Sequence, residues 1–172
     1  MTTSSSPGTD AAGTVTLRPM RWWDVESVMQ LEPVLFPSTP WTAAGFWSEL
    51  VGVPDTRYYV VAEDGSGLAG YAGLFVVGTE ADVQTVAVHP DRQGTGLGRL
   101  LVEDLLAQAR SRGCSRVMLE VREDNDAARR LYDRLGFEQV AVRRGYYGPG
   151  HDAVVMCLRL SATPDPGKTD AT

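Results

Sequence analysis

Hydrophobic and polar residues recur along the chain in two rhythms, and each rhythm predicts its own secondary structure. β-Branched and aromatic residues dominate 57–63, 68–77 and 82–88, and turn-forming residues separate these segments. The turn Asp64-Gly65-Ser66-Gly67 between the first two favours an antiparallel hairpin. Shorter segments of the same kind predict further strands at 14–18, 116–122, 140–144 and 153–160.

Apolar residues at helical spacing predict four helices. In the longest, Leu101 and Leu105 share one face of the helix. Asp24 and Thr42 are the expected N-caps of the first two helices, and a proline-rich loop at 33–41 separates them. The expected helices span residues 24–32, 42–51, 98–112 and 125–135.

The order of these elements is β-α-α-β-β-β-α-β-α-β-β, which indicates a mixed sheet in an α/β (α+β) domain. We place this domain at residues 14–160. Residues 1–13 and 161–172 are rich in small and polar residues and lack an apolar pattern, so we expect two disordered tails. A chain of 172 residues is long enough to bury one core without disulfide or metal staples.

Composition narrows the class of function. The net charge of −6 argues against binding to nucleic acid or to an anionic membrane. No apolar run reaches the length of a membrane span, and the first thirteen residues lack the pattern of a secretory signal. The chain has two cysteines and two histidines in no ligand-like spacing, so we expect no metal site and a cytoplasmic protein with free thiols.

A glycine-rich segment at 93–99 predicts an anion-binding site. It follows the expected strand 82–88 and opens the longest helix, where unpaired N–H groups and the helix dipole favour a negative ligand. Arg92 and Arg99 can add positive charge there. The segment is no dinucleotide fingerprint, because Arg99 stands where the third glycine is needed, and the chain contains no P-loop sequence. A glycine-rich turn that binds no ligand is the alternative.

Within this segment, Gln93-x-x-Gly96-x-Gly98 resembles the Q/R-x-x-G-x-G/A motif of the GNAT superfamily of N-acetyltransferases. The resemblance covers about residues 14–160 and implies the GNAT fold, a mixed and mostly antiparallel sheet of about seven strands flanked by about four helices. It also implies acetyl-CoA as the co-substrate. The residues implied to bind its pyrophosphate are Gln93, Gly94, Thr95, Gly96, Leu97, Gly98 and Arg99, and those implied to face its pantetheine arm are Val86, Ala87 and Val88.

A second block of the sequence is more specific. Residues 119–137 resemble the L-E-V-R-x-x-N-x-x-A-x-x-L-Y-x-x-x-G-F signature of RimI-like enzymes, which acetylate protein N-termini. Residues 36–42 and 143–147 are similar to that family's F-P-W-S and R-R-x-Y-Y segments, the first with extra residues inserted. The resemblance implies acetyl transfer to the N-terminal amine of a protein, the N-terminal alanine of a small-subunit ribosomal protein, by direct attack of the amine on the thioester.

Glu120 is the candidate catalytic base. On an extended strand Leu119 and Val121 face one side of the sheet, and Glu120 faces the other. A carboxylate in this position can accept the proton of an attacking amine, and the resemblance implies the same role. The alternative is a carboxylate at the sheet surface, paired with Arg116 or Arg122.

Asn125 and Tyr132 stand seven residues apart, on one face of the expected helix. The resemblance implies that Asn125 contacts coenzyme A and that the Tyr132 hydroxyl meets the sulfur as general acid. The residues themselves also allow a second interpretation, with Asn125 as an N-cap and Tyr132 as a core residue.

Four aromatic residues are candidates for the walls of an acceptor site. Phe36 and Trp41 lie in the proline-rich loop, and Tyr146 and Tyr147 lie in a glycine-flanked loop near the end of the domain. We expect a protein or peptide N-terminus as the partner, no nucleic acid, no membrane, and a monomer or weak dimer. Two other functions stay open: a GNAT enzyme for a small amine or an internal lysine, and a domain that binds acyl-CoA without catalysis.

Overall fold

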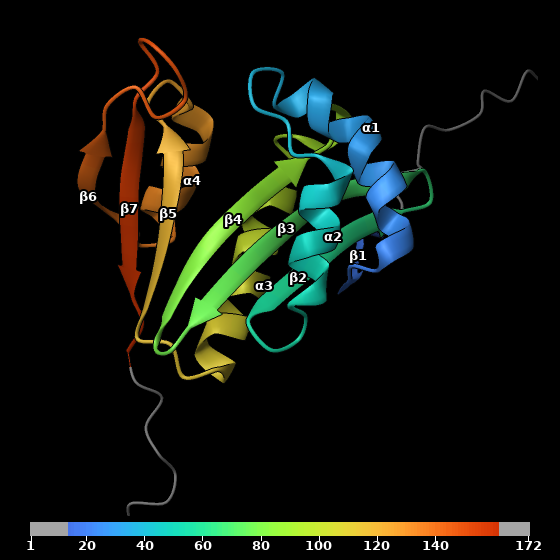
Figure 1. Cartoon of the computed structure of the whole chain (residues 1–172), viewed down its shortest axis with the longest axis horizontal. Coiled ribbons are helices and arrows are strands. Elements are labelled where there is room, and N and C mark those ends of the chain that lie inside the picture. Colours follow the sequence, from blue (N-terminus) through green and yellow to red (C-terminus); the bar gives the residue numbers. More distant parts are fainter. Residues whose placement is uncertain (1–13, 162–172) are drawn as a thin grey trace, which may run out of the picture.

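The computed structural model describes residues 14–161, in which seven strands form one sheet with helices on both faces (Figure 1). The strands are β1 (Thr16–Pro19), β2 (Arg57–Asp64), β3 (Gly67–Val77), β4 (Glu80–Val88), β5 (Arg116–Arg122), β6 (Glu138–Arg143) and β7 (Ala153–Arg159). The helices are α1 (Val25–Leu35), α2 (Ala43–Val51), α3 (Leu97–Ser111) and α4 (Asp126–Arg134), with short 3-10 turns η1 (Trp22–Asp24) and η2 (Pro90–Arg92). The expected fold class is confirmed, whereas the two expected tails lie outside the described residues, apart from Ser161.

The sheet has the strand order β1-β2-β3-β4-β5-β7-β6. Every neighbouring pair is antiparallel except β4 and β5, which run parallel on either side of the α3 crossover. The Asp64-to-Gly67 turn joins β2 to β3 as the antiparallel hairpin that its sequence predicts. At the other end of the sheet, β7 lies between β5 and β6, so the last strand of the fold is an interior one.

The two faces of the sheet bury two hydrophobic clusters. Successive side chains of β2 alternate between them: Tyr59 and Val61 pack under α1 and α2, whereas Val60 and Ala62 pack on the side of α3. Figure 1 shows α1 and α2 in front of the sheet and α3 behind it. The sequences of β2 and β3 are therefore nearly continuous apolar runs, because both faces of these strands are covered.

The first helix extends further than the sequence predicts. We expected a loop from Pro33 onward, whereas α1 continues through Pro33 to Leu35. A proline near the end of a helix removes its own N–H donor, but the residues after it keep theirs, and the Phe36 N–H still donates to the Glu32 carbonyl at 2.8 Å. The connection to α2 therefore starts at Phe36, and Thr42 caps α2 as expected by accepting the Gly45 N–H at 3.1 Å.

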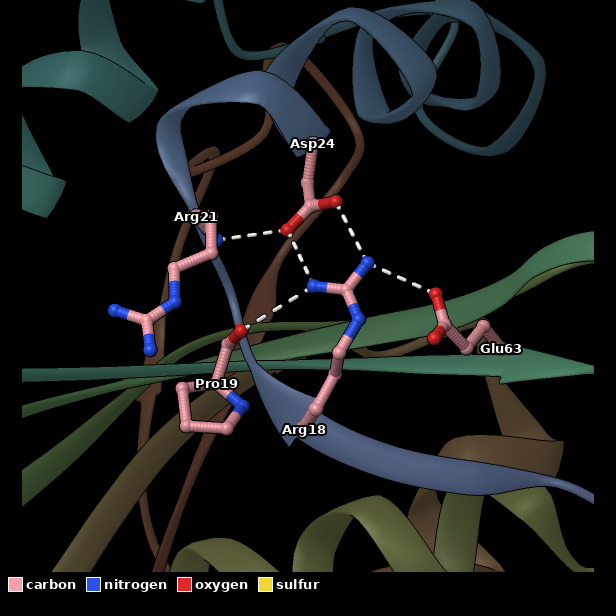
Figure 2. A network of polar contacts seen from close by, with 5 residues as sticks. All are labelled: Arg18, Pro19, Arg21, Asp24 and Glu63. Carbon is pink, nitrogen blue, oxygen red and sulfur yellow. Dashed lines mark hydrogen bonds and ion pairs between the residues drawn. The ribbon is translucent and has the colours of Figure 1, made fainter.

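Asp24 stands at the N-cap position of α1, as we expected, but its side chain makes no capping bond to that helix. Its own backbone is helical, and its carboxylate accepts the Arg21 N–H at 2.7 Å instead of a donor in α1 (Figure 2). The Arg18 guanidinium binds both oxygens of Asp24, at 2.7 and 2.8 Å, and reaches Glu63 at 2.8 Å. Burial raises the pKa of Asp24, but the bonds from Arg18 and Arg21 outweigh it and hold this pKa below its usual value. The network ties the start of α1 to the edge strand β1 and to its neighbour β2.

The pairing of β4 with β5 is short. Only Glu80, Ala81 and Asp82 of β4 pair with β5, opposite Arg116, Val117 and Met118. Beyond these residues the two strands diverge, as Figure 1 shows, and each keeps its other neighbour. The sheet is therefore split toward the carboxyl ends of β4 and β5, and within residues 14–161 the facing edge of β4 from Val83 to Val88 has no strand partner.

Candidate active site

A cavity of about 250 Å³ lies at this split. Gln84, Thr85 and Val86 line it from β4, and Glu120, Val121 and Arg122 line it from β5. The remaining walls come from the α1–α2 connection, from α4 and from the β6–β7 loop; the sequence candidates among them are Phe36, Trp41, Asn125, Tyr132 and Tyr147. The cavity thus brings together seven of the residues that the sequence selected, namely Phe36, Trp41, Val86, Glu120, Asn125, Tyr132 and Tyr147.

Glu120 projects into the cavity from the middle of β5. Its strand neighbours Leu119 and Val121 are buried on the opposite face, as the alternation predicts. The Glu120 side chain is 27% exposed, and one of its carboxylate oxygens lies 3.0 Å from the Arg143 guanidinium of β6. The alternative pairing with Arg116 or Arg122 is wrong, because these arginines pair with Glu80 and Asp124.

Arg143 reaches Glu120 across the intervening strand β7. The register places Glu120 opposite Val155 and Arg143 opposite Ala153, two residues further along the same face of β7. Ala153 is a small residue, so its side chain leaves the path of the arginine clear. The ion pair fixes the direction of the Glu120 carboxylate, and its partner stays accessible, with a side chain that is 55% exposed.

Tyr132 meets the same cavity from α4. Its ring is 8% exposed and packs edge-on against Phe137, with 5.7 Å between the ring centroids. Within residues 14–161 the Tyr132 hydroxyl has no hydrogen-bond partner. Burial, with a smaller contribution from Tyr147, raises the pKa of this phenol, so its proton is retained well above neutral pH. Tyr132 is therefore both a core residue and a protonated hydroxyl at the cavity.

Asn125 is the N-cap of α4, which was one of its two interpretations. Its side-chain oxygen accepts the Ala128 N–H at 3.1 Å. Asn125 also lines the cavity, and the carbonyl that caps the helix leaves the amide –NH₂ group free of that bond. The same side chain is thus available to a ligand while it caps the helix.

Of the two adjacent tyrosines in the β6–β7 loop, one lies at the cavity and the other lies outside it. Tyr147 lines the cavity, and its hydroxyl lies 3.5 Å from the Glu120 carbonyl oxygen. Burial raises the pKa of Tyr147 to about 12. Tyr146 is 52% exposed outside the cavity, where its ring packs edge-on against Tyr147 and lies 5.4 Å from the Arg143 guanidinium. Of the two tyrosines predicted to bind substrate, only Tyr147 lies at the cavity.

The glycine-rich segment forms an open helix N-terminus. Gly94 and Gly96 have positive φ angles of 75° and 89°, and Gly96 is the N-cap of α3, where it has no side chain to cover the helix end. Leu100 is the first residue to donate back, to the Gly96 carbonyl at 3.1 Å, so the N–H groups of Leu97, Gly98 and Arg99 have no partner inside the helix. This geometry suits a phosphate ligand.

Two arginines at the glycine-rich segment, Arg92 just before it and Arg99 at its end, both form ion pairs. Arg92 pairs with Asp64 at 2.6 Å and thereby ties the glycine-rich segment to the β2–β3 turn. Arg99 pairs with Glu103 one turn further along α3, at 2.7 Å, and its side chain remains 65% exposed. We therefore assign the positive field at this end of α3 mainly to the backbone N–H groups and the helix dipole, with Arg99 able to turn toward a ligand.

Several residues that line the cavity or lie next to it were absent from the sequence interpretation. Gln84 and Thr85 were missed because the site was placed on 86–88, whereas the split in the sheet begins just after Asp82. Arg143 was quoted only as part of a loop motif. Glu32, a buried carboxyl beneath the α1–α2 connection, carried one available signal, since it lies on the apolar face of its helix seven residues after Val25.

Comparisons with known proteins agree with this geometry. The model of the Acetyltransferase (GNAT) family matches residues 13–137. N-alpha-acetyltransferase RimI of Mycobacterium tuberculosis is 41% identical over 148 residues, which cover 83% of this chain and 90% of that protein. The [ribosomal protein bS18]-alanine N-acetyltransferase of Salmonella typhimurium is 40% identical over 128 residues, which cover 71% and 82%. The crystal structure of the ribosomal-protein-S18-alanine N-acetyltransferase from Escherichia coli superposes with a TM-score of 0.79 at 31% identity, covering 89% of this chain and 98% of that one.

The chain belongs to the GNAT acetyltransferase family. It is an N-acetyltransferase, and acetyl-CoA is its co-substrate. The open end of α3 and the unpaired edge of β4 are suited to the phosphates and to the amide-containing arm of that molecule. Among residues 14–161 there is no cluster of ligating side chains suited to a metal ion, and no helix in this part of the chain is long and apolar enough to cross a bilayer.

The glycine-rich segment yields a first prediction. Gly96→Ala should weaken coenzyme A binding about tenfold, because a Cβ in this left-handed conformation costs about 1–2 kcal/mol and shifts the N–H groups around it. Gly98→Ala is the matched control: its Cβ would lie 3.4 Å from Leu131 and 3.6 Å from Val88, in ordinary contact, and affinity should change less than threefold. Calorimetric titration with coenzyme A measures both, and equal losses would contradict the assignment.

Proposed function

We propose that this enzyme is an acetyl-CoA-dependent N-alpha-acetyltransferase that modifies the N-terminal alanine of ribosomal protein bS18 in the cytoplasm. One observation carries the chemical part of this proposal: Glu120 and Tyr132 line a single cavity although they lie on opposite faces of the sheet. The choice of substrate is supported by relatives that are named for this reaction.

In this mechanism the acceptor amine attacks the thioester carbonyl directly. The amine enters from the α1–α2 side, between the wall of Phe36 and Trp41 and the Tyr147 ring. Glu120 accepts a proton from the amine, directly or through one water, as the C–N bond forms. The C–S bond then breaks, and the sulfur departs as a thiolate that is protonated by solvent after release.

Tyr132 supplies a hydrogen bond to the departing sulfur. A free phenol, with a pKa near 10, is already a weaker acid than a thiol near 8.5, and burial raises the pKa of Tyr132 further. Complete proton transfer from this tyrosine is therefore less favourable than the sequence interpretation assumed. A hydrogen bond from a retained hydroxyl still stabilises the negative charge that develops on sulfur.

An α-amine suits this cavity better than a lysine side chain. The pKa of an α-amine is about 7.7–8.0, so a fair fraction is neutral at physiological pH, whereas that of a lysine amine is about 10.4. One carboxylate is then a sufficient base for an N-terminal substrate. Cys114 is buried away from the cavity on the α3 side, which fits direct attack better than an acyl-cysteine intermediate.

A peptide panel analysed by mass spectrometry tests the proposal. The enzyme and acetyl-CoA are incubated with the N-terminal peptide of bS18, with the same peptide carrying a blocked N-terminus and one internal lysine, and with a small polyamine. We expect acetylation of the α-amine of the first peptide and none of the second. Product on the lysine or the polyamine alone would support the other acceptor classes, and binding of acetyl-CoA without any product would indicate a non-catalytic domain.

A further inference from the structure

Glu32 is a buried carboxyl group that the reaction does not use. It lies near the end of α1 with no exposed surface, and it does not line the cavity. One of its oxygens accepts the Tyr71 hydroxyl at 2.6 Å, and the other accepts the Trp41 backbone N–H at 2.9 Å. Within residues 14–161 no arginine, lysine or histidine pairs with it.

These two bonds connect three parts of the fold. Glu32 belongs to α1, Tyr71 belongs to the interior strand β3, and Trp41 ends the connection that forms one wall of the cavity. The Glu32 backbone carbonyl also accepts the Phe36 N–H, so this single residue holds the connection at both ends. Through Tyr71, the wall is fixed relative to the sheet and therefore relative to Glu120.

The packing around Trp41 extends the same anchor. The Trp41 ring lies 5.2 Å from Phe46 of α2, and Phe46 in turn packs edge-on against Tyr71 at 5.8 Å. The backbone of Trp41 is thus held by Glu32 and its ring by Phe46. Phe36 and Trp41 face the cavity from a segment whose ends cannot move independently of α1 and β3.

The two donors at this position favour a side chain with two acceptor oxygens. Burying such a group is unfavourable unless its oxygens accept hydrogen bonds, so an apolar side chain would be the simpler choice for a helix core. Two oxygens on one planar group accept two donors that arrive from different elements. Glutamine has a single acceptor oxygen. If that oxygen accepts the Trp41 N–H, the –NH₂ group faces the Tyr71 hydroxyl, which must then turn its own hydrogen away and accept instead.

We propose that Glu32 is a positioning residue for acceptor binding, which holds the Phe36-to-Trp41 wall at the distance from Glu120 that a peptide N-terminus needs. This inference rests on the proposed function, because it assigns the wall to the acceptor peptide. It leaves the coenzyme A site, on the other face of the sheet, independent of Glu32.

The test compares Glu32→Gln with Tyr71→Phe and with Val102→Ala. The last variant truncates a buried side chain of α3, in the other hydrophobic cluster, and lowers stability without touching the wall. For Glu32→Gln we expect the KM for the peptide to rise about tenfold, with the KM for acetyl-CoA changed less than twofold. For Tyr71→Phe, which leaves the bond to Trp41 in place, we expect a rise of about threefold. Val102→Ala should leave both KM values unchanged.

Hydrogen exchange of the segment 36–42 provides a readout that needs no substrate. In Glu32→Gln this segment should exchange at least tenfold faster than in the wild type, and in Val102→Ala it should not, apart from the uniform change that lower stability causes. Unchanged exchange and unchanged peptide KM would overturn the inference, as would equal losses for both substrates. If Glu32→Gln does not fold, Tyr71→Phe decides by the same two measurements. A wild type that does not acetylate the peptide would overturn the proposed function alone, since the exchange comparison still reports the anchor.

Discussion

Replacing Glu120 with glutamine should lower kcat/KM for an α-amine peptide about 10²–10⁴-fold at pH 7. The amide keeps the size of the side chain but accepts no proton, so the amine has to lose its proton to solvent. The variant should regain part of this loss at pH 9, where more of the peptide α-amine is already neutral. Steady-state rates at both pH values, with calorimetric titration of coenzyme A, measure the effect, and coenzyme A affinity should stay within twofold.

Glu138→Gln is the control for this substitution. Glu138 lies exposed on β6, two strands away from Glu120 in the sheet, and makes no ion pair within the described residues. Its variant should match the wild type in rate and affinity. Glu120→Gln also removes the ion pair with Arg143. This should lower the free energy of unfolding only slightly, since exposed ion pairs contribute about 0–1 kcal/mol. A Glu120→Gln enzyme with full activity at pH 7 would exclude this carboxylate as the base.

The second large effect is expected for Tyr132→Phe, which should lower kcat about 10²–10³-fold. The Tyr132 hydroxyl has no partner within residues 14–161, so its removal should leave the free energy of unfolding unchanged or slightly higher. The ring contact with Phe137 remains. Chemical denaturation and single-turnover rates measure the two quantities separately.

Tyr58→Phe should show the opposite pattern. The Tyr58 hydroxyl donates to Asp104 of α3 at 2.8 Å, away from the cavity. Its loss should cost about 1 kcal/mol of stability and leave kcat unchanged. If Tyr132→Phe lost stability and kept its rate instead, the tyrosine would be a core residue without a part in the chemistry.

The sequence predicted the secondary structure well because local signals were strong. Gly96 at the start of α3, Thr42 at the start of α2 and Asn125 at the start of α4 occupy positions where their backbone or side-chain chemistry suits a helix end. The prediction was wrong about the Asp24 side chain and about the loop at Pro33. The Asp24 carboxylate is held by Arg18 of β1, a long-range contact, and α1 continues past Pro33 because the Phe36 N–H still donates to Glu32.

The site was only partly predictable, for a related reason. Residues were selected by type and motif, so Glu120, Tyr132 and Trp41 were found, but their meeting point depends on where β4 and β5 stop pairing. No periodicity in either strand marks that point. The same holds for Arg143, whose distance from Glu120 is set by the insertion of β7 between β5 and β6.

The acceptor and the acetyl donor are proposed to bind to segments that lie far apart in the sequence. The segment proposed to bind the acceptor lies between α1 and α2, whereas the glycine-rich segment proposed to bind the donor lies between β4 and α3, on the other side of the sheet. Substitutions and insertions in the first, such as those around Ser38 and Thr39, leave the second untouched. Acceptor preference can therefore diverge among descendants of one ancestral enzyme, while the donor and the chemistry at the split stay the same.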